Sequence, residues 1–253
     1  MASSGQAAPS FVRAAAHPLR WRLLTELAGS DYRVRELTER TGQPQNLVSY
    51  HLRLLRDEEL VTARRSTFDA RDSYYHLDLD RCAQALTTAG ATLHPALRLG
   101  PPPTVPARWP DGIRVLFACT GNSARSPIAE ALLRHRGEGR IEVTSAGSNP
   151  KPHLHPHAVR ALREEFGIDV DGQRPRHLDT LAGRRFDHVI TLCDKVREVC
   201  PAFGGEARPI HWSIPDPAAG RGTYPDFARV VAEIDTRVRH LLPVLATTTP
   251  SEG

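Results

Sequence analysis

Cysteine is scarce in this sequence, at four residues among 253. Four cysteines in a chain of this length do not form the dense disulfide framework of a small secreted domain, so we expect free, catalytic or metal-binding thiols. No apolar run approaches the roughly 20 residues that a membrane-spanning helix requires. The first residues, Met1-Ala-Ser-Ser-Gly-Gln, have neither the basic nor the apolar region of a signal peptide. We therefore expect a cytoplasmic protein with no membrane partner.

Lysine is also scarce, and the two halves of the chain do not differ strongly in charge. Of the 33 cationic residues only Lys151 and Lys195 are lysine, and the formal net charge is +4. Neither half of the chain carries a polybasic tail, so charge alone does not establish nucleic-acid binding. The length is sufficient for two domains of ordinary size.

A proline-rich stretch divides the sequence in two. Five of the 13 residues at 100–112 are proline, which disfavours both helix and sheet and gives a semi-rigid spacer. We predict a linker over residues 99–112 between domains at 11–98 and 113–245. Small polar residues predict disordered tails at 1–10 and 246–253.

The first domain has the pattern of short helices followed by a hairpin. Apolar residues recur at helical spacing after Pro18, a second short helix is predicted over 34–40, and a third over 44–55. Two β-prone runs, 60–65 and 73–77, follow with a polar turn between them. This order predicts an α+β winged helix-turn-helix.

The third helix has one apolar face and one polar face. Val48, Leu52 and Leu55 form the apolar face. The outward residues can reach base edges in the major groove, and arginines on the wing can meet phosphates. The candidate DNA-binding residues are Gln45, Asn46, Ser49, Tyr50, Arg53, Arg64, Arg65 and Arg71. A helical domain with an ordinary solvated polar face remains the alternative.

Two segments, Ala16–Leu24 and Ser49–Leu55, resemble the ArsR-type family of metalloregulatory repressors. The resemblance covers about residues 11–90 and implies a homodimer that leaves its operator DNA when an inducer binds. Arsenic-sensing members often carry a Cys-x-Cys pair near the first helix of the motif, and residues 34–40 here contain no cysteine. Cys82 stands alone, and we expect it to be a buried structural thiol.

The second domain opens with a short apolar run, Ile113–Ala118, which predicts a buried parallel strand. Cys119 follows at once, then a loop and a helix that suits Pro127 in its first turn. The loop consists of Thr120, Gly121, Asn122, Ser123 and Ala124, and is followed by Arg125 and Ser126.

A strand followed by a loop and the beginning of a helix creates a site that favours the binding of an anion. The loop amides and the helix N-terminus point toward it, and Arg125 can grip a tetrahedral oxyanion with two hydrogen bonds. We expect the same field to lower the pKa of Cys119 and Ser126 to donate to its thiolate. A Cys-x5-Arg-Ser sequence after a strand is a strong signal for an oxyanion-binding thiol site.

This segment resembles the low-molecular-weight protein tyrosine phosphatases and the arsenate reductases that share their fold. The resemblance runs over about residues 113–245 and implies an α/β domain with a central parallel sheet. Asp216, before Pro217, then matches the general acid of the family, and Asn122 and Ser145 match structural positions near the loop. Phosphatases usually have an aromatic residue after Asp-Pro, whereas this chain has Ala218.

Two further cysteines favour the reductase. A second buried strand ends at Cys193, and Cys200 follows seven positions later. Because the carboxyl ends of parallel strands meet on one side of a sheet, we expect Cys193 near Cys119. Reduction of arsenate requires two electrons, which a pair of thiols supplies, whereas a phosphatase has no need of them. The spacing resembles the redox pair of thioredoxin-coupled arsenate reductases.

The sequence thus predicts an arsenate reductase fused to an arsenic-responsive repressor. We expect Cys119, Arg125, Ser126, Cys193, Cys200 and Asp216 to act on arsenate or a phosphate-like oxyanion, with no bound cofactor or metal and with thioredoxin or a small thiol as external reductant. The histidines at 153, 155 and 157 are interpreted as a loop-to-helix junction instead of a metal site. The alternatives are a tyrosine phosphatase fused to a DNA-binding domain, and a repressor with a non-catalytic thiol sensor.

Overall fold

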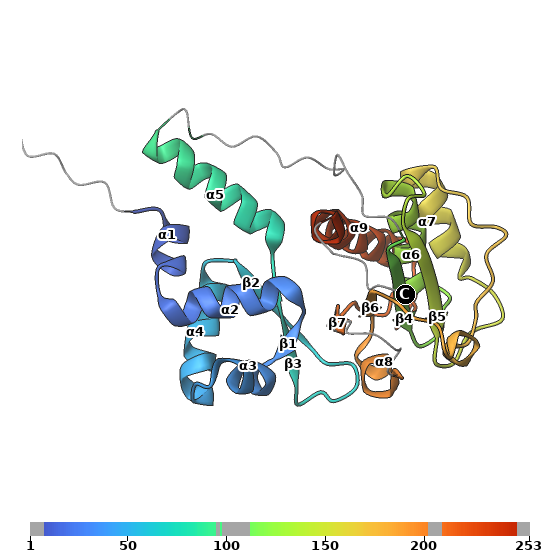
Figure 1. The fold of residues 1–253 in the computed structure, drawn as a ribbon, viewed down its shortest axis with the longest axis horizontal. Coiled ribbons are helices and arrows are strands. Elements are labelled where there is room, and N and C mark those ends of the chain that lie inside the picture. Colours follow the sequence, from blue (N-terminus) through green and yellow to red (C-terminus); the bar gives the residue numbers. More distant parts are fainter. Residues whose placement is uncertain (1–7, 95–96, 98–111, 202–208, 247–253) are drawn as a thin grey trace, which may run out of the picture. The chain divides into compact units, whose positions relative to one another are not determined.

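The computed structural model describes residues 8–94, 97, 112–201 and 209–246. The chain divides into two compact units, residues 1–102 and 103–253 (Figure 1). Nearly all of the predicted linker at 99–112 and most of the two predicted tails lie outside the described residues. The first helix begins at Ser10 and the last ends at Ala246, so each includes one residue of a predicted tail.

The N-terminal unit confirms the winged helix-turn-helix. Gly42, at a φ of 65° in the left-handed region, ends the second predicted helix, and the third packs against its neighbours through Val48, Leu52 and Leu55. The three strands form an antiparallel sheet in the order β1-β3-β2. Its elements are α1 (Ser10–Ala15), α2 (Pro18–Gly29), β1 (Tyr32–Arg33), α3 (Val34–Thr41), α4 (Gln45–Asp57), β2 (Val61–Arg65), β3 (Ser73–Leu77) and α5 (Leu79–Leu93).

Helix α5 is an element of this unit that the sequence pattern did not predict. Leu79, Leu86 and Leu93 recur at seven-residue spacing, as on one face of a helix, but among the residues of α5 only Cys82 is buried. Asp78 caps its N-terminus by accepting a hydrogen bond from the Arg81 amide at 2.8 Å. Cys82 packs into the core of this unit, as expected of a structural thiol.

The C-terminal unit confirms the α/β domain with a parallel sheet. The strand order is β5-β4-β6-β7, and all three pairings are parallel. Its elements are β4 (Arg114–Cys119), α6 (Arg125–Arg136), β5 (Glu142–Gly147), α7 (Pro156–Phe166), the short 3-10 helix η2 (Leu178–Leu181), β6 (His188–Thr191), α8 (Asp194–Val199), β7 (Ile210–His211) and α9 (Tyr224–Ala246). No described helix is long and apolar enough to cross a membrane.

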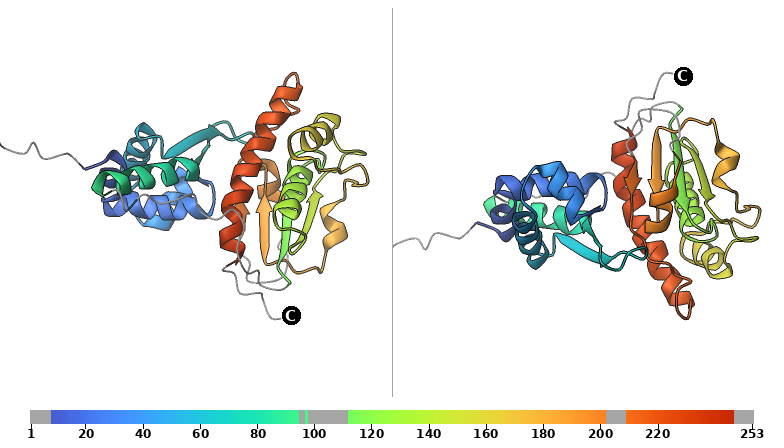
Figure 2. Two further views of the ribbon diagram at one scale, coloured as in Figure 1. Left: turned by 90° about the horizontal axis from the view of Figure 1, so that it is seen from above. Right: turned by 90° about the horizontal axis from the view of Figure 1, so that it is seen from below.

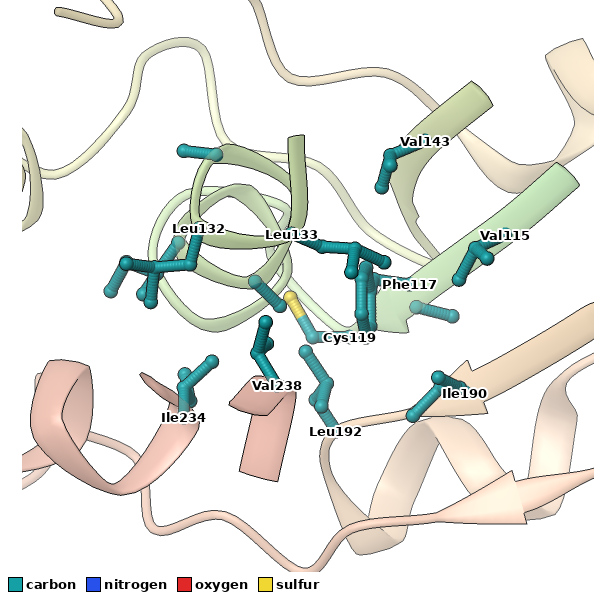
Figure 3. Close-up of a cluster of buried hydrophobic side chains, with 14 of the residues drawn as sticks. Val115, Phe117, Cys119, Leu132, Leu133, Val143, Ile190, Leu192, Ile234 and Val238 are labelled. Atoms are coloured by element: carbon teal, nitrogen blue, oxygen red, sulfur yellow. The ribbon is translucent and has the colours of Figure 1, made fainter. Parts of the chain in front are cut away.

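Strand β4 lies inside the sheet, and Val115–Cys119 are buried. Helices α6 and α9 pack against each other over the sheet (Figure 2). Alternate side chains of β4, Val115, Phe117 and Cys119, point toward these two helices (Figure 3). The core therefore fixes the last residue of β4, which places the Cys119 thiol at the carboxyl edge of the sheet.

Candidate oxyanion and thiol site

The loop after β4 is braced from inside by Asn122. Its backbone has a φ of 43°, in the left-handed region, and its amide donates to Cys119 Sγ at 3.3 Å. The side-chain amide donates to Ser126 Oγ at 2.9 Å and Ser145 Oγ at 2.8 Å, while its oxygen accepts from the Arg176 amide at 2.8 Å. Asn122 thus ties the loop to α6, to β5 and to the segment before η2.

Gly147, the last residue of β5, permits the close approach of this loop. A Cβ atom at that position would lie 2.5 Å from the carbonyl oxygen of Thr120 and 2.9 Å from the amide nitrogen of Asn122. Both contacts are with backbone, which cannot move aside without distorting the loop. Gly147 therefore permits the loop conformation that forms the anion site.

The Cys119 thiol is buried, with 2% of the residue exposed, and lies 2.9 Å from Ser126 Oγ. Burial raises the pKa of this thiol, and Arg125 and the Ser126 hydrogen bond lower it by less. The net direction contradicts the expected lowering. Removal from water disfavours the thiolate more than the neighbouring donors favour it.

Replacing Ser126 with alanine should raise the pKa of Cys119 further, because a donor to the thiolate is lost. At neutral pH, alkylation of Cys119 should become slower, and its pH profile should move to higher pH. Ser145→Ala is the matched control. Ser145 also accepts a hydrogen bond from Asn122, but it is not among the groups that shift the pKa of Cys119. An equal shift in both variants would show that loop distortion, and not the hydrogen bond, sets the pKa.

Arg125, the first residue of α6, links the loop to a distant segment. Its Nη1 donates to the carbonyl oxygen of Ile214 at 3.2 Å, and its Nη2 donates to Asp216 Oδ2 at 3.1 Å. The other oxygen of Asp216 accepts from the amide of Ala218 at 3.1 Å. The guanidinium is buried whereas nearly half of the Asp216 side chain is exposed, so the carboxyl group stands at the entrance of the site.

Cys193 lies beside the loop. It precedes α8 as its N-cap, is 3% exposed, and places its Sγ 3.3 Å from Thr120 Oγ1. Its charge acts on Cys119, raising the pKa of that thiol. Cys200 lies at the other end of α8 and is half-buried; burial raises its pKa to about 11. The structure therefore brings Cys193, but not Cys200, to the oxyanion loop.

The predicted DNA-binding residues lie on one unit and the thiol site on the other. All five on α4 are exposed, as are Arg65 and Arg71 in the wing, while Arg64 is half-buried. Arg65 donates to the carbonyl oxygen of Ala70 at 2.7 Å, which ties the strand to the wing turn. His51, on the inner side of α4, is buried against His17, with ring centroids 4.3 Å apart.

The model of the family "Low molecular weight phosphotyrosine protein phosphatase" matches residues 114–250, which is more than half of the chain. The chain belongs to this family. In addition, residues 17–63 match the model "Bacterial regulatory protein, arsR family", so an ArsR-type helix-turn-helix precedes the phosphatase-family domain.

Curated relatives of the phosphatase-family domain carry the name arsenate reductase. One from Shouchella clausii is 37% identical over 131 residues, covering 49% of this chain and 91% of the relative. Another, from Brevibacillus brevis, is 36% identical over 125 residues, covering 49% and 90%. A solved arsenate reductase from Archaeoglobus fulgidus is 31% identical, covers 51% of this chain and 98% of its own, and has a TM-score of 0.44.

His155 is a residue of the site that the sequence pattern did not indicate. Its amide donates to the carbonyl oxygen of Ser123 at 2.7 Å, and its ring stacks on Phe227 with centroids 4.2 Å apart. Burial and His157 lower the pKa of His155, whereas Asp216 raises it, so this imidazole lies within the field of that carboxyl group. No cluster of three metal-binding side chains occurs among the described residues. A histidine before Pro156 could have been predicted as the cap of α7, but not as a neighbour of Asp216.

Proposed function

We propose that the phosphatase-family domain reduces arsenate to arsenite through Cys119, Cys193 and Cys200, and that the ArsR-type domain is a DNA-binding repressor. One observation carries the enzymatic half, namely Cys193 held by Thr120 beside the loop of Cys119. Hydrolysis of a phosphate ester has no use for a second thiol there. The names of the relatives agree with this choice.

In the first step the Cys119 thiolate attacks arsenate. Arg125 and the loop amides hold the oxyanion, and Ser126 and Arg125 offset part of the cost that burial imposes on the thiolate. A sulfur–arsenic bond forms and an arsenic–oxygen bond breaks. Asp216, held at the entrance by Arg125, protonates the departing oxygen so that it leaves as water.

In the second step the Cys193 thiolate attacks the sulfur of Cys119. A disulfide forms between the two cysteines, and the sulfur–arsenic bond breaks with its electron pair going to arsenic. Arsenic is thereby reduced from the +5 to the +3 state and leaves as arsenite. Two thiols are oxidised for each arsenate, so the electrons balance.

In the third step Cys200 attacks Cys193 and releases the Cys119 thiolate. The two residues flank α8, and seven residues at about 1.5 Å of helical rise separate their Cα atoms by roughly 10 Å. A disulfide requires Cα atoms within about 7 Å. Helix α8 must therefore unwind for this exchange, after which a thioredoxin-like protein or a small thiol reduces the Cys193–Cys200 disulfide.

Turnover with a reductant tests the enzymatic proposal. The reduced full-length protein is incubated with arsenate, thioredoxin, thioredoxin reductase and NADPH, and both NADPH loss and arsenite are measured. Stoichiometric NADPH loss and arsenite formation are expected. Phosphate release from an aryl phosphate by a variant with serine at both 193 and 200, together with no arsenite from the parent, would instead favour the phosphatase.

The DNA-binding half rests on the exposed face of α4 and the wing. The face carries amide, hydroxyl and guanidinium groups, and its width suits the major groove. We place the domain in a homodimer, because Val12 on α1 and Leu86 and Leu93 on α5 are exposed apolar side chains on two helices that pack together. DNA and a thiol reductant both occur in the cytoplasm, where we place the protein.

Two variants separate base contacts from phosphate contacts. Replacing Arg71 with alanine should weaken binding to all sequences and reduce the slope of log affinity against log salt by about 1. Gln45→Ala should instead relax the preference for operator DNA by about 1–3 kcal/mol. Fluorescence anisotropy at several salt concentrations measures both effects, with Arg229→Ala in the other unit as the matched control. The proposal fails if the parent protein binds no promoter DNA at low salt.

A further inference from the structure

A buried polar cluster outside the thiol loop has no part in the steps above. It consists of Asp194, His211 and Ser213, which are 2%, 2% and 4% exposed. His211 Nε2 lies 3.2 Å from Asp194 Oδ1, and Ser213 Oγ donates to the same oxygen at 2.8 Å. The other ring nitrogen of His211 lies 2.9 Å from Thr191 Oγ1. One carboxylate oxygen therefore joins the start of α8 to the last residue of β7 and to the segment that follows it.

Each end of this cluster adjoins a group of the proposed reaction. Asp194 directly follows Cys193 and is the first residue of α8. Ser213 directly precedes Ile214, whose carbonyl oxygen accepts from Arg125 at 3.2 Å, and Asp216 lies two residues further on. A short path of hydrogen bonds and adjacent residues thus connects Cys193 to Arg125. It runs from Asp194 to Ser213, and from Ile214 to Arg125.

The energetics of burial make this cluster rigid. A carboxylate removed from water is stable only while its hydrogen-bond partners stay in place. Asp194 therefore cannot leave His211 and Ser213 without a penalty, and a displacement of the first turn of α8 is resisted by the segment 211–216. A displacement of the segment 211–216 is likewise resisted by the first turn of α8, because a coupling between two positions is reciprocal.

We propose that Asp194 is a positioning residue. It couples the position of Cys193 to the part of the oxyanion site that Arg125 and Asp216 form. Oxyanion binding then holds Cys193 in its reduced position against the loop, at the N-cap of an intact α8. Unwinding of α8 for the Cys193–Cys200 disulfide removes Asp194 from the cluster and loosens the oxyanion site. The inference rests on the proposed function for the assignment of the oxyanion site.

The coupling is measurable without any turnover. In a full-length Cys119→Ser background, alkylation of Cys193 by iodoacetamide is followed by peptide mass spectrometry with and without saturating inorganic phosphate. Phosphate should slow alkylation of Cys193 by on the order of tenfold in this background. Adding Asp194→Asn should reduce the effect of phosphate to about twofold or less, and weaken phosphate binding by on the order of fivefold. Direct shielding of Cys193 by bound phosphate would persist in this variant.

Two further variants control for damage to the fold. Ser213→Ala removes one hydrogen bond and keeps the pair of Asp194 with His211, so the phosphate effect should be intermediate. Asp235→Asn is the matched control, since Asp235 is a buried carboxylate of α9 that binds Arg136 at 2.5 and 2.7 Å. It should lower thermal stability and keep the full phosphate effect.

Calorimetric titration with phosphate separates the possible failures. Full retention of the phosphate effect in Asp194→Asn and Ser213→Ala would overturn the coupling and leave the proposed function intact. If the Cys119→Ser protein bound no phosphate, the oxyanion site and this inference would both be wrong. Absence of arsenite in the turnover assay, with the coupling present, would overturn arsenate reduction alone.

Discussion

Replacing Cys193 with serine should lower arsenate turnover by about three orders of magnitude or more, to the background rate. Serine cannot form the disulfide that breaks the sulfur–arsenic bond, so no electron pair reaches arsenic. The rate of arsenite formation in the thioredoxin-coupled assay measures this effect. Binding of phosphate should change little, because Arg125 and the loop amides remain and serine can keep the contact with Thr120.

The other cysteines supply matched controls for this result. Cys200→Ser should release arsenite once for each protein molecule and then stop at a Cys119–Cys193 disulfide, visible as a burst. Cys82→Ser should keep full turnover, since Cys82 lies in α5 of the other unit. Unchanged turnover by Cys193→Ser would contradict the relay, because arsenic would then be reduced without a Cys119–Cys193 disulfide.

Replacing Arg125 with lysine should reduce kcat/KM for arsenate by on the order of 10²–10³. Lysine keeps the charge, but its single ammonium group cannot hold Ile214, Asp216 and two oxygens of an oxyanion in the fixed geometry of a guanidinium. The loss should appear in kcat/KM and in a weaker inhibition by phosphate. The pKa of Cys119 should change little, because Arg125 lowers that pKa through its charge and lysine keeps a positive charge.

Arg136→Lys is the matched control for this prediction. Arg136 also makes two hydrogen bonds with one carboxylate, that of Asp235, at 2.5 and 2.7 Å. The substitution should lower the melting temperature and leave kcat/KM within about twofold, as expected of a structural pair. If both variants lost activity in proportion to their loss of stability, Arg125 would be structural and the oxyanion would be held elsewhere.

Much of the fold could be predicted from residues that lie close together in the sequence. The hairpin of β2 and β3, the glycine that ends α3 and the order of strand, loop and helix around Cys119 depend on residues a few positions apart. Backbone preferences and short-range periodicity determine such elements, so the sequence predicts them. Helix α5 was not predicted, although Leu79, Leu86 and Leu93 recur at helical spacing along it.

The sequence by itself indicated the candidate residues for the chemistry, namely Cys119, Arg125, Cys193 and Asp216. Tertiary structure alone decided their contacts, since Thr120 meets Cys193 across 73 positions and Arg125 meets Asp216 across 91. It also decided the direction of the Cys119 pKa and the pairing of Asp194 with His211. Burial and long-range contacts depend on how all the elements pack around β4, and no short segment contains that information.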